Sequence, residues 1–164
     1  MSHQTPEESN FFNEDTKVPQ ASQEVEEWRN SQHYDPPFGI ERWRVIDEVW
    51  NGKTAIDAVV LVDVNGRQEF GAAQGVGGVN ALDQALRQVL TNHFPFIETV
   101  QLVELYTHRG GAGTAAEVVS IMKFSDGVQQ WSTMRQSRDL LESAWLALID
   151  GYEWAITMSR KTSE

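Results

Sequence analysis

Residues 54–66 read TAIDAVVLVDVNG, and residues 114–127 read TAAEVVSIMKFSDG. The two segments share a Thr-Ala start and an acidic residue three positions later, Asp57 in one and Glu117 in the other. Each continues through a glycine turn, a short polar strand and an amphipathic helix. An internal repeat constrains the architecture more strongly than a local motif does. The chain is therefore expected to contain one β-β-β-α unit built twice, with no room for a separate catalytic domain.

The first copy shows strand and helix patterns in that order. Residues 42–50 and 54–64 alternate apolar and polar side chains, as half-buried strands do, and residues 67–73 return as their partner. Asn65-Gly66 is a strong hairpin signal, because both residues tolerate the positive φ of a type I′ turn. An apolar helical stripe then runs through Ala81, Leu82, Ala85, Leu86, Val89 and Leu90.

The ends of this helix carry their own signals. Asn80 is the expected N-cap, and Asp83 places a carboxylate near the positive end of the helix dipole. Pro95 is expected to end the helix, since proline lacks the backbone N–H that a helix needs.

The second copy repeats the order, with strands expected at residues 100–108, 114–124 and 128–134 and a turn at Asp126-Gly127. Asp139 stands where the next helix starts. The apolar stripe of that helix is Leu140, Leu141, Ala144, Trp145, Leu148 and Ile149. Two three-stranded antiparallel sheets with one helix each predict an α+β fold. Because a helix covers one face of its sheet, the other face is expected to meet the sister unit or a second chain.

The charge is concentrated at the N-terminus. The 164 residues carry a net charge of −11, of which residues 1–35 contribute −6. We expect an acidic, disordered tail over residues 1–37 and a folded domain over 38–160. Within the tail, residues 22–29 could form a short helix with Val25 and Trp28 on one side. Two interpretations stay open, a solubilising tail and a docking segment that orders on a partner protein.

Composition excludes several classes of function. The chain has no Cys, hence no disulfide framework and no thiolate metal site. It lacks the clustered Lys and Arg that bind nucleic acid. No apolar run reaches the ~18 residues of a membrane span, and the first residues lack the pattern of a signal peptide. We therefore expect a cytoplasmic protein with no nucleic-acid or membrane partner.

Two glycine clusters are candidates for a binding site. Residues 71–78 end in GVGG before a helix start, where free N–H groups can hold a carboxylate or phosphate. They match neither the dinucleotide pattern nor the P-loop, so the alternatives are a tight turn and a site for a small carboxylate. Residues 109–114, RGGAGT, are either a strand connection or a flexible wall of a ligand site. The four His show no metal-ligand spacing, and no catalytic triad is evident. We expect no metal, no cofactor and no enzyme activity, although cryptic catalysis stays open.

Four segments carry a family resemblance. They are GVGGVNALDQAL at 75–86, AGTAAEVV at 112–119, WSTM at 131–134 and SRDLLESAWLALIDGYEW at 137–154. In order and spacing they resemble the C-terminal regulatory domain of 2-isopropylmalate synthase and citramalate synthase. The resemblance covers roughly residues 42–156. It implies a homodimer of β-β-β-α pairs that binds leucine or isoleucine and regulates a TIM-barrel enzyme of branched-chain amino acid biosynthesis.

The resemblance also implies which residues would contact the effector. They are Gly75, Val76, Gly77, Gly78, Val79 and Asn80 in the glycine loop, Val103, Leu105 and Tyr106 on a wall strand, and Gly113, Thr114 and Ala115 in a closing loop. Val76 stands where the family has Asp or Asn, and Gly78 where it has Pro. A polar side chain at the first position could hold an ammonium group, and Val cannot.

Two principal functions follow from these expectations. The first is a stand-alone, non-catalytic regulatory domain that dimerises, senses a branched-chain amino acid or related small carboxylate, and regulates a partner in trans. The alternative is a dimeric scaffold without a ligand, which docks partner proteins through residues 1–35.

Overall fold

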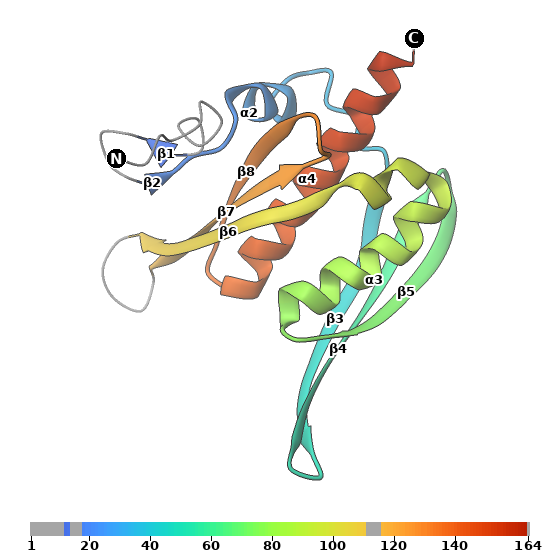
Figure 1. Ribbon diagram of the computed structural model, residues 1–164, viewed down its shortest axis with the longest axis vertical. Helices are drawn as coiled ribbons and strands as arrows, with labels where there is room; N and C mark the ends of the chain where they lie inside the picture. The colour runs from blue at the N-terminus through green and yellow to red at the C-terminus, as the bar shows by residue number, and fades with distance from the viewer. Residues whose placement is uncertain (1–11, 14–17, 111–115, 164) are drawn as a thin grey trace. The chain divides into compact units, whose positions relative to one another are not determined.

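The computed structural model in Figure 1 describes residues 12–13, 18–110 and 116–163. The chain divides into two compact units. Among the described residues, unit 1 contains those up to Asp35 and those within Thr99–Trp154, and unit 2 contains Pro36–Glu98 and those from Ala155 onward. Each unit holds a three-stranded antiparallel sheet with a helix, which confirms the expected α+β fold.

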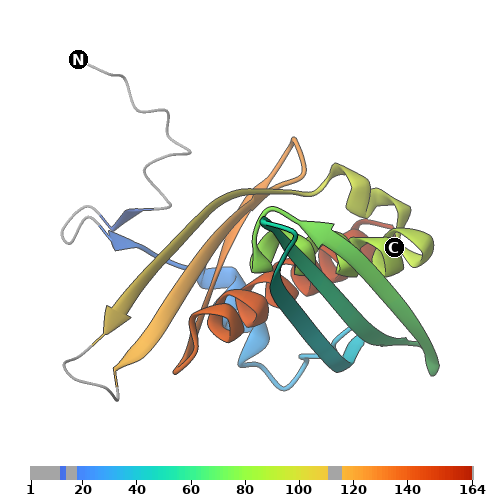
Figure 2. The same ribbon diagram turned by 90° about the horizontal axis from the view of Figure 1, so that it is seen from below.

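Unit 2 is formed mainly by residues between the two parts of unit 1. Its elements are β3 (Gly39–Trp50), β4 (Lys53–Val64), β5 (Arg67–Gly75), α3 (Gly78–His93) and most of the 3-10 helix η1 (Pro95–Thr99). The strand order is β3-β4-β5, with both pairs antiparallel. Helix α3 runs along one face of this sheet (Figure 2). The helix ends at His93, two residues before Pro95, as expected from the presence of that proline.

Two Asn-Gly turns shape the sheet of unit 2. Asn65 and Gly66 have φ values of 54° and 79°, as a type I′ hairpin requires, and Asp63 Oδ1 accepts the Gly66 N–H at 3.0 Å. The predicted hairpin is confirmed. Asn51 and Gly52 also have positive φ values, 52° and 75°, and join β3 to β4. Strand β4 is thus bounded by the same turn chemistry at both ends.

The core of unit 2 follows the predicted periodicities. The six apolar residues of the predicted stripe on α3 are the buried residues of that helix. On β4 the buried side chains alternate along the strand, at Ala58, Val60, Val62 and Val64. A period of about 3.6 on the helix and 2 on the strand therefore places both apolar surfaces in one core.

The β3–β4 ribbon projects beyond the rest of the sheet (Figure 1). Pairing of β4 with β5 ends at Ile56 and Gly75, whereas pairing of β3 with β4 continues to the turn. The apolar face predicted on β3 is consequently half-buried at Trp43 and Val45 but 73% exposed at Val49.

Unit 1 is assembled from an N-terminal segment and from Thr99–Trp154, which are separated in the sequence by most of unit 2. Its sheet consists of β6 (Gln101–Gly110), β7 (Glu117–Ser125) and β8 (Gln130–Ser137) in that order. Helix α4 (Leu140–Thr162) belongs to unit 1 up to Trp154. The N-terminal part adds α2 (Gln23–Arg29) and the two-residue strands β1 (Phe12–Asn13) and β2 (Val18–Pro19), which pair antiparallel.

Helix α4 is tied to the sheet of unit 1 by hydrogen bonds as well as by apolar packing. The bonds that join them include Ser120 with Ser143 at 2.6 Å, Thr133 with the Ala147 carbonyl at 2.7 Å, and the Trp131 indole with the Gly151 carbonyl at 3.0 Å. The Phe124 ring stacks on Trp131 and packs so closely on α4 that a Cβ at Gly151 would collide with it. These bonds satisfy polar atoms that would otherwise be buried without partners.

Several boundaries in unit 1 differ from the sequence prediction. Val128 was expected in a strand, but it lies in the β7–β8 loop and is 88% exposed. Asp126 Oδ1 accepts the Val128 and Gln129 N–H groups and stabilises this four-residue turn. Leu140 of the predicted stripe is exposed, because it is the first residue of α4. The helix start itself is as predicted, since Asp139 Oδ1 accepts the Glu142 N–H at 2.7 Å.

The N-terminal segment is folded where the sequence predicted disorder. Residues 23–29 form α2, and its Val25 and Trp28 are buried in unit 1. The predicted apolar side of this helix was therefore right, and the disorder expected of residues 18–35 was wrong. The acidic composition of the segment suggested disorder. A seven-residue helix can nevertheless dock through only two large apolar side chains. Across the described residues, no helix combines the length and apolar character needed to cross a membrane.

Candidate functional site

The glycine loop predicted from sequence is shorter in the structure. Strand β5 ends at Gly75 and α3 begins at Gly78, so the turn itself comprises only Val76 and Gly77. The Gly77 carbonyl accepts the Ala81 N–H at 2.9 Å, which is the first intrahelical bond. Val76 is 94% exposed. The residues of the predicted glycine loop thus lie together at the start of α3.

Asn80 does not cap α3, contrary to the sequence prediction. Gly77 is the N-cap residue, and Asn80 lies within the first turn. Its Oδ1 accepts the Val76 N–H at 3.1 Å and the Gln84 Nε2–H at 3.0 Å. Asn80 therefore closes the turn from inside and occupies one of the N–H groups that we expected a ligand carboxylate to use.

The positive end of α3 is left uncompensated. Gly77 has no side chain to cap the helix, and the first turn contains no acidic residue. Asp83 is in the second turn, so its expected role near the helix start is wrong. Because free N–H groups and the helix dipole favour negative charge, this end of unit 2 suits an anionic ligand group.

Two of the glycines differ in why they are needed. A Cβ at Gly75 would lie 2.5 Å from the Ala81 nitrogen and 2.7 Å from its Cα, which no side chain tolerates. Close approach of β5 to α3 thus explains Gly75 without a ligand. At Gly77 no atom lies within 4 Å of the point that a Cβ would occupy. That position faces open space and could accommodate a ligand.

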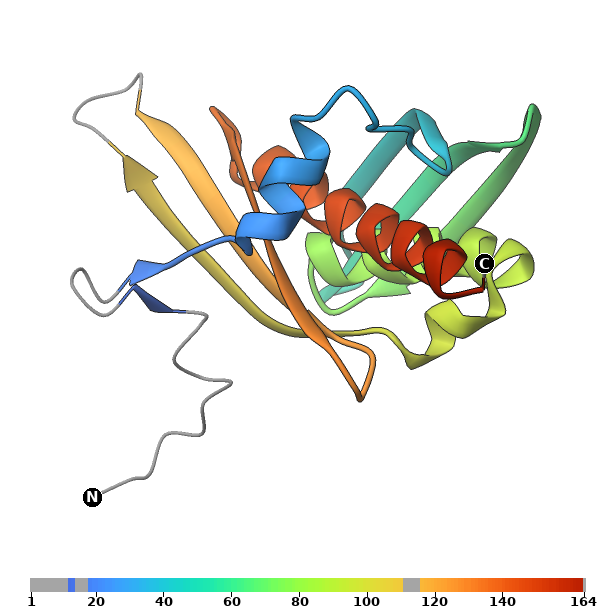
Figure 3. The ribbon, with the colours of Figure 1, turned by 90° about the horizontal axis from the view of Figure 1, so that it is seen from above.

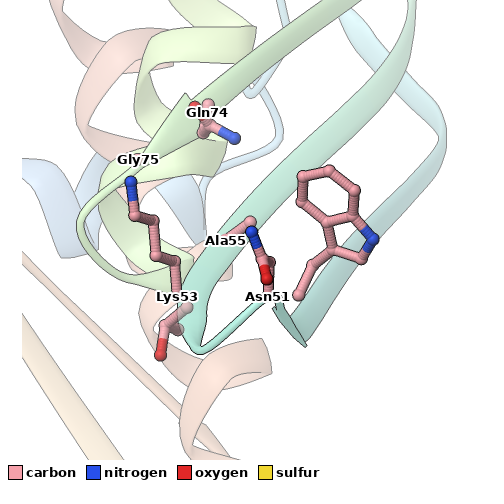
Figure 4. A pocket seen from close by; sticks show the side chains of 7 residues that line it. Asn51, Lys53, Ala55, Gln74 and Gly75 are labelled. Atoms are coloured by element: carbon pink, nitrogen blue, oxygen red, sulfur yellow. The ribbon is translucent and has the colours of Figure 1, made fainter.

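A pocket of about 360 Å³ adjoins this turn. Its lining residues come from the β3–β4 ribbon and the end of β5, namely Trp50, Asn51, Lys53, Thr54, Ala55, Gln74 and Gly75. Figure 4 shows the Lys53 side chain extending from the ribbon toward the end of β5. Of the described residues that were predicted to bind the effector, only Gly75 lines the pocket.

Lys53 is the residue that sequence reasoning missed. Its ammonium group makes no ion pair with any residue within 12–13, 18–110 or 116–163. The Gln74 amide beside it donates to Asp57 Oδ1 at 3.2 Å. A free ammonium in a pocket can bind a carboxylate strongly, since a charged donor strengthens the hydrogen bond. The Asn51-Gly52 dipeptide was the available signal, because it places Lys53 directly after a tight turn.

The predicted wall strand corresponds to β6 in unit 1. Cross-strand pairing puts Leu105 level with Met122 and Thr133, whose hydroxyl bonds α4, whereas Tyr106 is level with Ile121. Successive strand residues point to opposite faces. Leu105 and Tyr106 therefore lie on different faces of the sheet, and a ligand resting on one face meets one of them.

Tyr106 has a polar neighbour on its own face. Its ring centroid lies 5.7 Å from that of His108. The His108 Nδ1 is buried and has no hydrogen-bond partner among the residues described. Val103 is half-exposed at a bulge in the β6–β7 pairing. Gly113, Thr114 and Ala115 of the predicted closing loop lie outside the described residues.

Metal chemistry has no evident place in the part of the chain that the structure describes. No three His, Cys, Asp or Glu residues there are grouped closely enough to hold an ion. His93 is paired with Glu69 at 2.8 Å within unit 2. The candidate site consists of a lysine, a helix start and apolar surface.

A sequence model of the LeuA allosteric (dimerisation) domain matches residues 23–156. The chain belongs to the LeuA allosteric (dimerisation) domain family. This confirms the resemblance to the regulatory domain of 2-isopropylmalate and citramalate synthases. The match begins at residue 23, so the family's domain includes α2, which the resemblance in sequence had left outside.

Curated relatives of this LeuA-type domain are citramalate synthases. The chain is 33% identical to the (R)-citramalate synthase of Geobacter sulfurreducens over 76% of the chain, which is 24% of that enzyme. It is 38% identical to that of Synechocystis over 62% of the chain and 19% of the enzyme. The (R)-citramalate synthase of Aquifex aeolicus is 34% identical over 57% of the chain and 18% of the enzyme. The chain thus spans about a quarter or less of these relatives.

Proposed function

We propose that this LeuA-type domain is non-catalytic, pairs with a second copy, and binds a branched-chain amino acid or a related small carboxylate to regulate a partner protein. The observation that carries the proposal is the match of residues 23–156 to an allosteric domain. The matched part is the regulatory domain of enzymes much longer than this chain. Their synthase activity is therefore not part of the proposal.

The geometry of unit 2 supports a carboxylate as the recognised group. The Lys53 ammonium and the uncapped start of α3 both favour negative charge, and Lys53 borders a pocket that ends at Gly75. Val76, exposed at the turn, and Trp50 in the pocket offer apolar surface to a branched side chain. An amino-acid ligand needs these two kinds of contact together with an acceptor for its ammonium group.

Ligand-induced stabilisation tests the proposal. The chain is heated with leucine, isoleucine, valine or the corresponding keto acids, and its midpoint of thermal unfolding is recorded. A ligand at ~100 times its dissociation constant adds about 2.7 kcal/mol to the free energy of unfolding. A concentration-dependent rise with at least one of these compounds is expected. The proposal is wrong if none of them changes the midpoint.

Two pairs of variants locate the site. Lys53→Gln should weaken binding by removing the ammonium group, whereas Lys161→Gln removes the same charge from the exposed end of α4 and should have no effect. Gly77→Asp should oppose a carboxylate at the start of α3 by charge repulsion. Val128→Asp adds the same charge to an exposed turn of unit 1 and serves as its control. If the two variants of either pair change ligand binding equally, the ligand does not bind at this turn.

The scaffold alternative makes a different prediction. It uses residues 1–35 as a docking arm, but Val25 and Trp28 are already buried within unit 1. Their apolar surface is consequently not free to dock a partner. Capture of a partner protein that is lost on deletion of residues 1–17, in a chain that responds to no small carboxylate, would favour the scaffold over the sensor.

A further inference from the structure

Residues 22–34, here called the clasp, lie against α4 and the edge of β8 within unit 1 (Figure 3). At the edge, the Ser22 N–H donates to the Ser132 carbonyl at 3.0 Å, and the Ser132 N–H donates to Ser22 Oγ at 2.8 Å. β8 is the last strand of its sheet, so these backbone groups have no strand partner. The start of the clasp thus completes the sheet edge.

Aromatic packing holds the middle of the clasp. The Trp28 ring meets the Tyr34 ring edge-on at 4.9 Å and the Trp154 ring of α4 at 5.6 Å. Val25 is fully buried beside it on the same side of α2. The apolar contact fixes the clasp over the last residues of α4 that belong to unit 1.

The clasp is not expected to remain helical when it is detached from α4. Helix α2 has seven residues, and no side chain caps its N-terminus. The Ser22 hydroxyl, which could have capped it, is bonded to Ser132 instead. A helix this short is unstable in isolation. Detachment of the clasp is therefore expected to unfold α2, so that docking and helix formation occur together.

Buried charges lie between the clasp and α4. The Arg29 Nη1 is 2.7 Å from Asp150 Oδ1, and the Arg135 Nη1 of β8 is 3.1 Å from Asp150 Oδ2. The Tyr34 hydroxyl donates to Glu153 Oε2 at 2.6 Å, and Arg29 lies 3.5 Å from the same oxygen. The side chains of Asp150 and Glu153 are only 3% and 6% exposed.

The cluster has more acids than bases. Asp150 and Glu153 face two guanidinium groups, those of Arg29 and Arg135, and the half-exposed Glu26 of α2 adds a further negative charge that acts on Asp150. With every group ionised these five side chains sum to −1, and the two carboxylates that are closed to water are Asp150 and Glu153. One bound proton makes the cluster neutral.

Glu153 is the carboxyl group that we expect to bind this proton. Asp150 contacts both arginines, whereas the partners of Glu153 among the described residues are Arg29, at the longer distance, and the Tyr34 hydroxyl. Burial raises the pKa of Asp150 to about 6. Burial, with a contribution from the Asp150 charge, raises the pKa of Glu153 to about 7.

We propose that the clasp is a proton-controlled latch, in which a proton held by the buried pair Asp150 and Glu153 keeps residues 22–34 docked on α4 and its loss releases them. When the clasp detaches, both carboxyl groups meet water and return to ordinary acidity, near pH 4. The docked state then binds more protons than the released state between about pH 4.5 and pH 7. Docking is consequently strong at the acid end of this window and weakens as the pH rises through it.

Amide hydrogen exchange of the complete chain tests this latch. Protection of residues 23–29 is measured from pH 5 to pH 8 and corrected for the intrinsic exchange rate, with β7 as the internal reference. A single carboxyl group whose pKa is raised this far in the docked state should lower the equilibrium constant for docking roughly tens of fold between pH 5 and pH 8. Protection in β7 should not change in parallel, because β7 is the central strand of the sheet.

A pair of glutamine variants identifies the group. Glu153→Gln is neutral at every pH, and we expect it to keep α2 protected at pH 8. Glu24→Gln removes a charge from the exposed side of the same helix and should behave as the wild type. Equal protection of α2 at pH 5 and pH 8 would overturn the proposal, as would an unchanged pH dependence in Glu153→Gln or a parallel loss in β7. The wild-type series decides the matter even if Glu153→Gln does not fold.

Discussion

Gly75→Ala tests how closely β5 approaches α3 at the candidate site. The new methyl group would lie 2.5 Å from the Ala81 nitrogen and 2.7 Å from Asn80 Oδ1. Overpacking of this kind costs ~1–3 kcal/mol. Displacing Asn80 also breaks its bond to the Val76 N–H, for about 1 kcal/mol. Alanine also restricts the backbone of the unfolded chain more than glycine does, and this offsets ~0.4–1 kcal/mol of the destabilisation. We expect a net destabilisation of about 2 kcal/mol.

Urea unfolding followed by circular dichroism measures this difference. With a slope of about 2 kcal/mol per M, the midpoint should fall by roughly 1 M. Gly77→Ala is the matched control, since its backbone is extended at φ −161° and nothing lies within 4 Å of the added methyl group. The restricted unfolded chain stabilises this variant by ~0.4–1 kcal/mol, and alanine is a poorer N-cap than glycine by a similar amount, so it should unfold near the wild-type midpoint. Identical midpoints for the two variants would refute the described packing of β5 on α3 and with it the explanation of Gly75.

Three further predictions concern the turns, the second helix and the assembly. Asn65→Ala should destabilise unit 2 by ~1 kcal/mol in the same urea assay, because its φ of 54° is unfavourable for residues other than Gly and Asn; an unchanged midpoint would contradict the type I′ turn. Asp139→Ala should cost about 1 kcal/mol through loss of the bond from the Glu142 N–H, and Asp139→Asn should restore most of it. Sedimentation at micromolar concentration should give a dimer, as the dimerisation family suggests; a compact monomer would count against the proposed pairing.

The elements that could be predicted from sequence are those fixed by local chemistry. The stripe from Ala81 to Leu90 is buried as expected, because helical periodicity and the need for a core select the same residues. Asn65-Gly66 forms its hairpin because those two residues tolerate positive φ. Asp139 starts α4 for an equally local reason, the bond from its carboxylate to the Glu142 N–H.

The features that escaped prediction depend on residues far apart in the chain. The clasp is ordered by Asp150 and Glu153, which are more than 115 positions from Arg29 and Tyr34. No local pattern in an acidic segment reports such partners. The N-cap of α3 was misplaced for a related reason: Asn80 was assigned by residue type, but its side-chain Oδ1 accepts the Val76 N–H instead of capping the helix.

The candidate site was predicted only in part. The glycine turn was located from its GVGG sequence before a helix start, and the structure shows it at the uncapped start of α3. Lys53 was missed, because it reaches the site through the β3–β4 ribbon and not through the glycine motif. Opposite orientations of Leu105 and Tyr106 follow from strand geometry and could have been anticipated, since the two residues are adjacent.

Isothermal titration of the purified chain with leucine and with isoleucine tests the central claim most directly. The account predicts saturable binding of at least one of them, weakened at least tenfold in Lys53→Gln and unchanged in Lys161→Gln. An absence of binding by either amino acid at millimolar concentration, in a chain that is folded and dimeric, would contradict the claim that this domain is an amino-acid sensor.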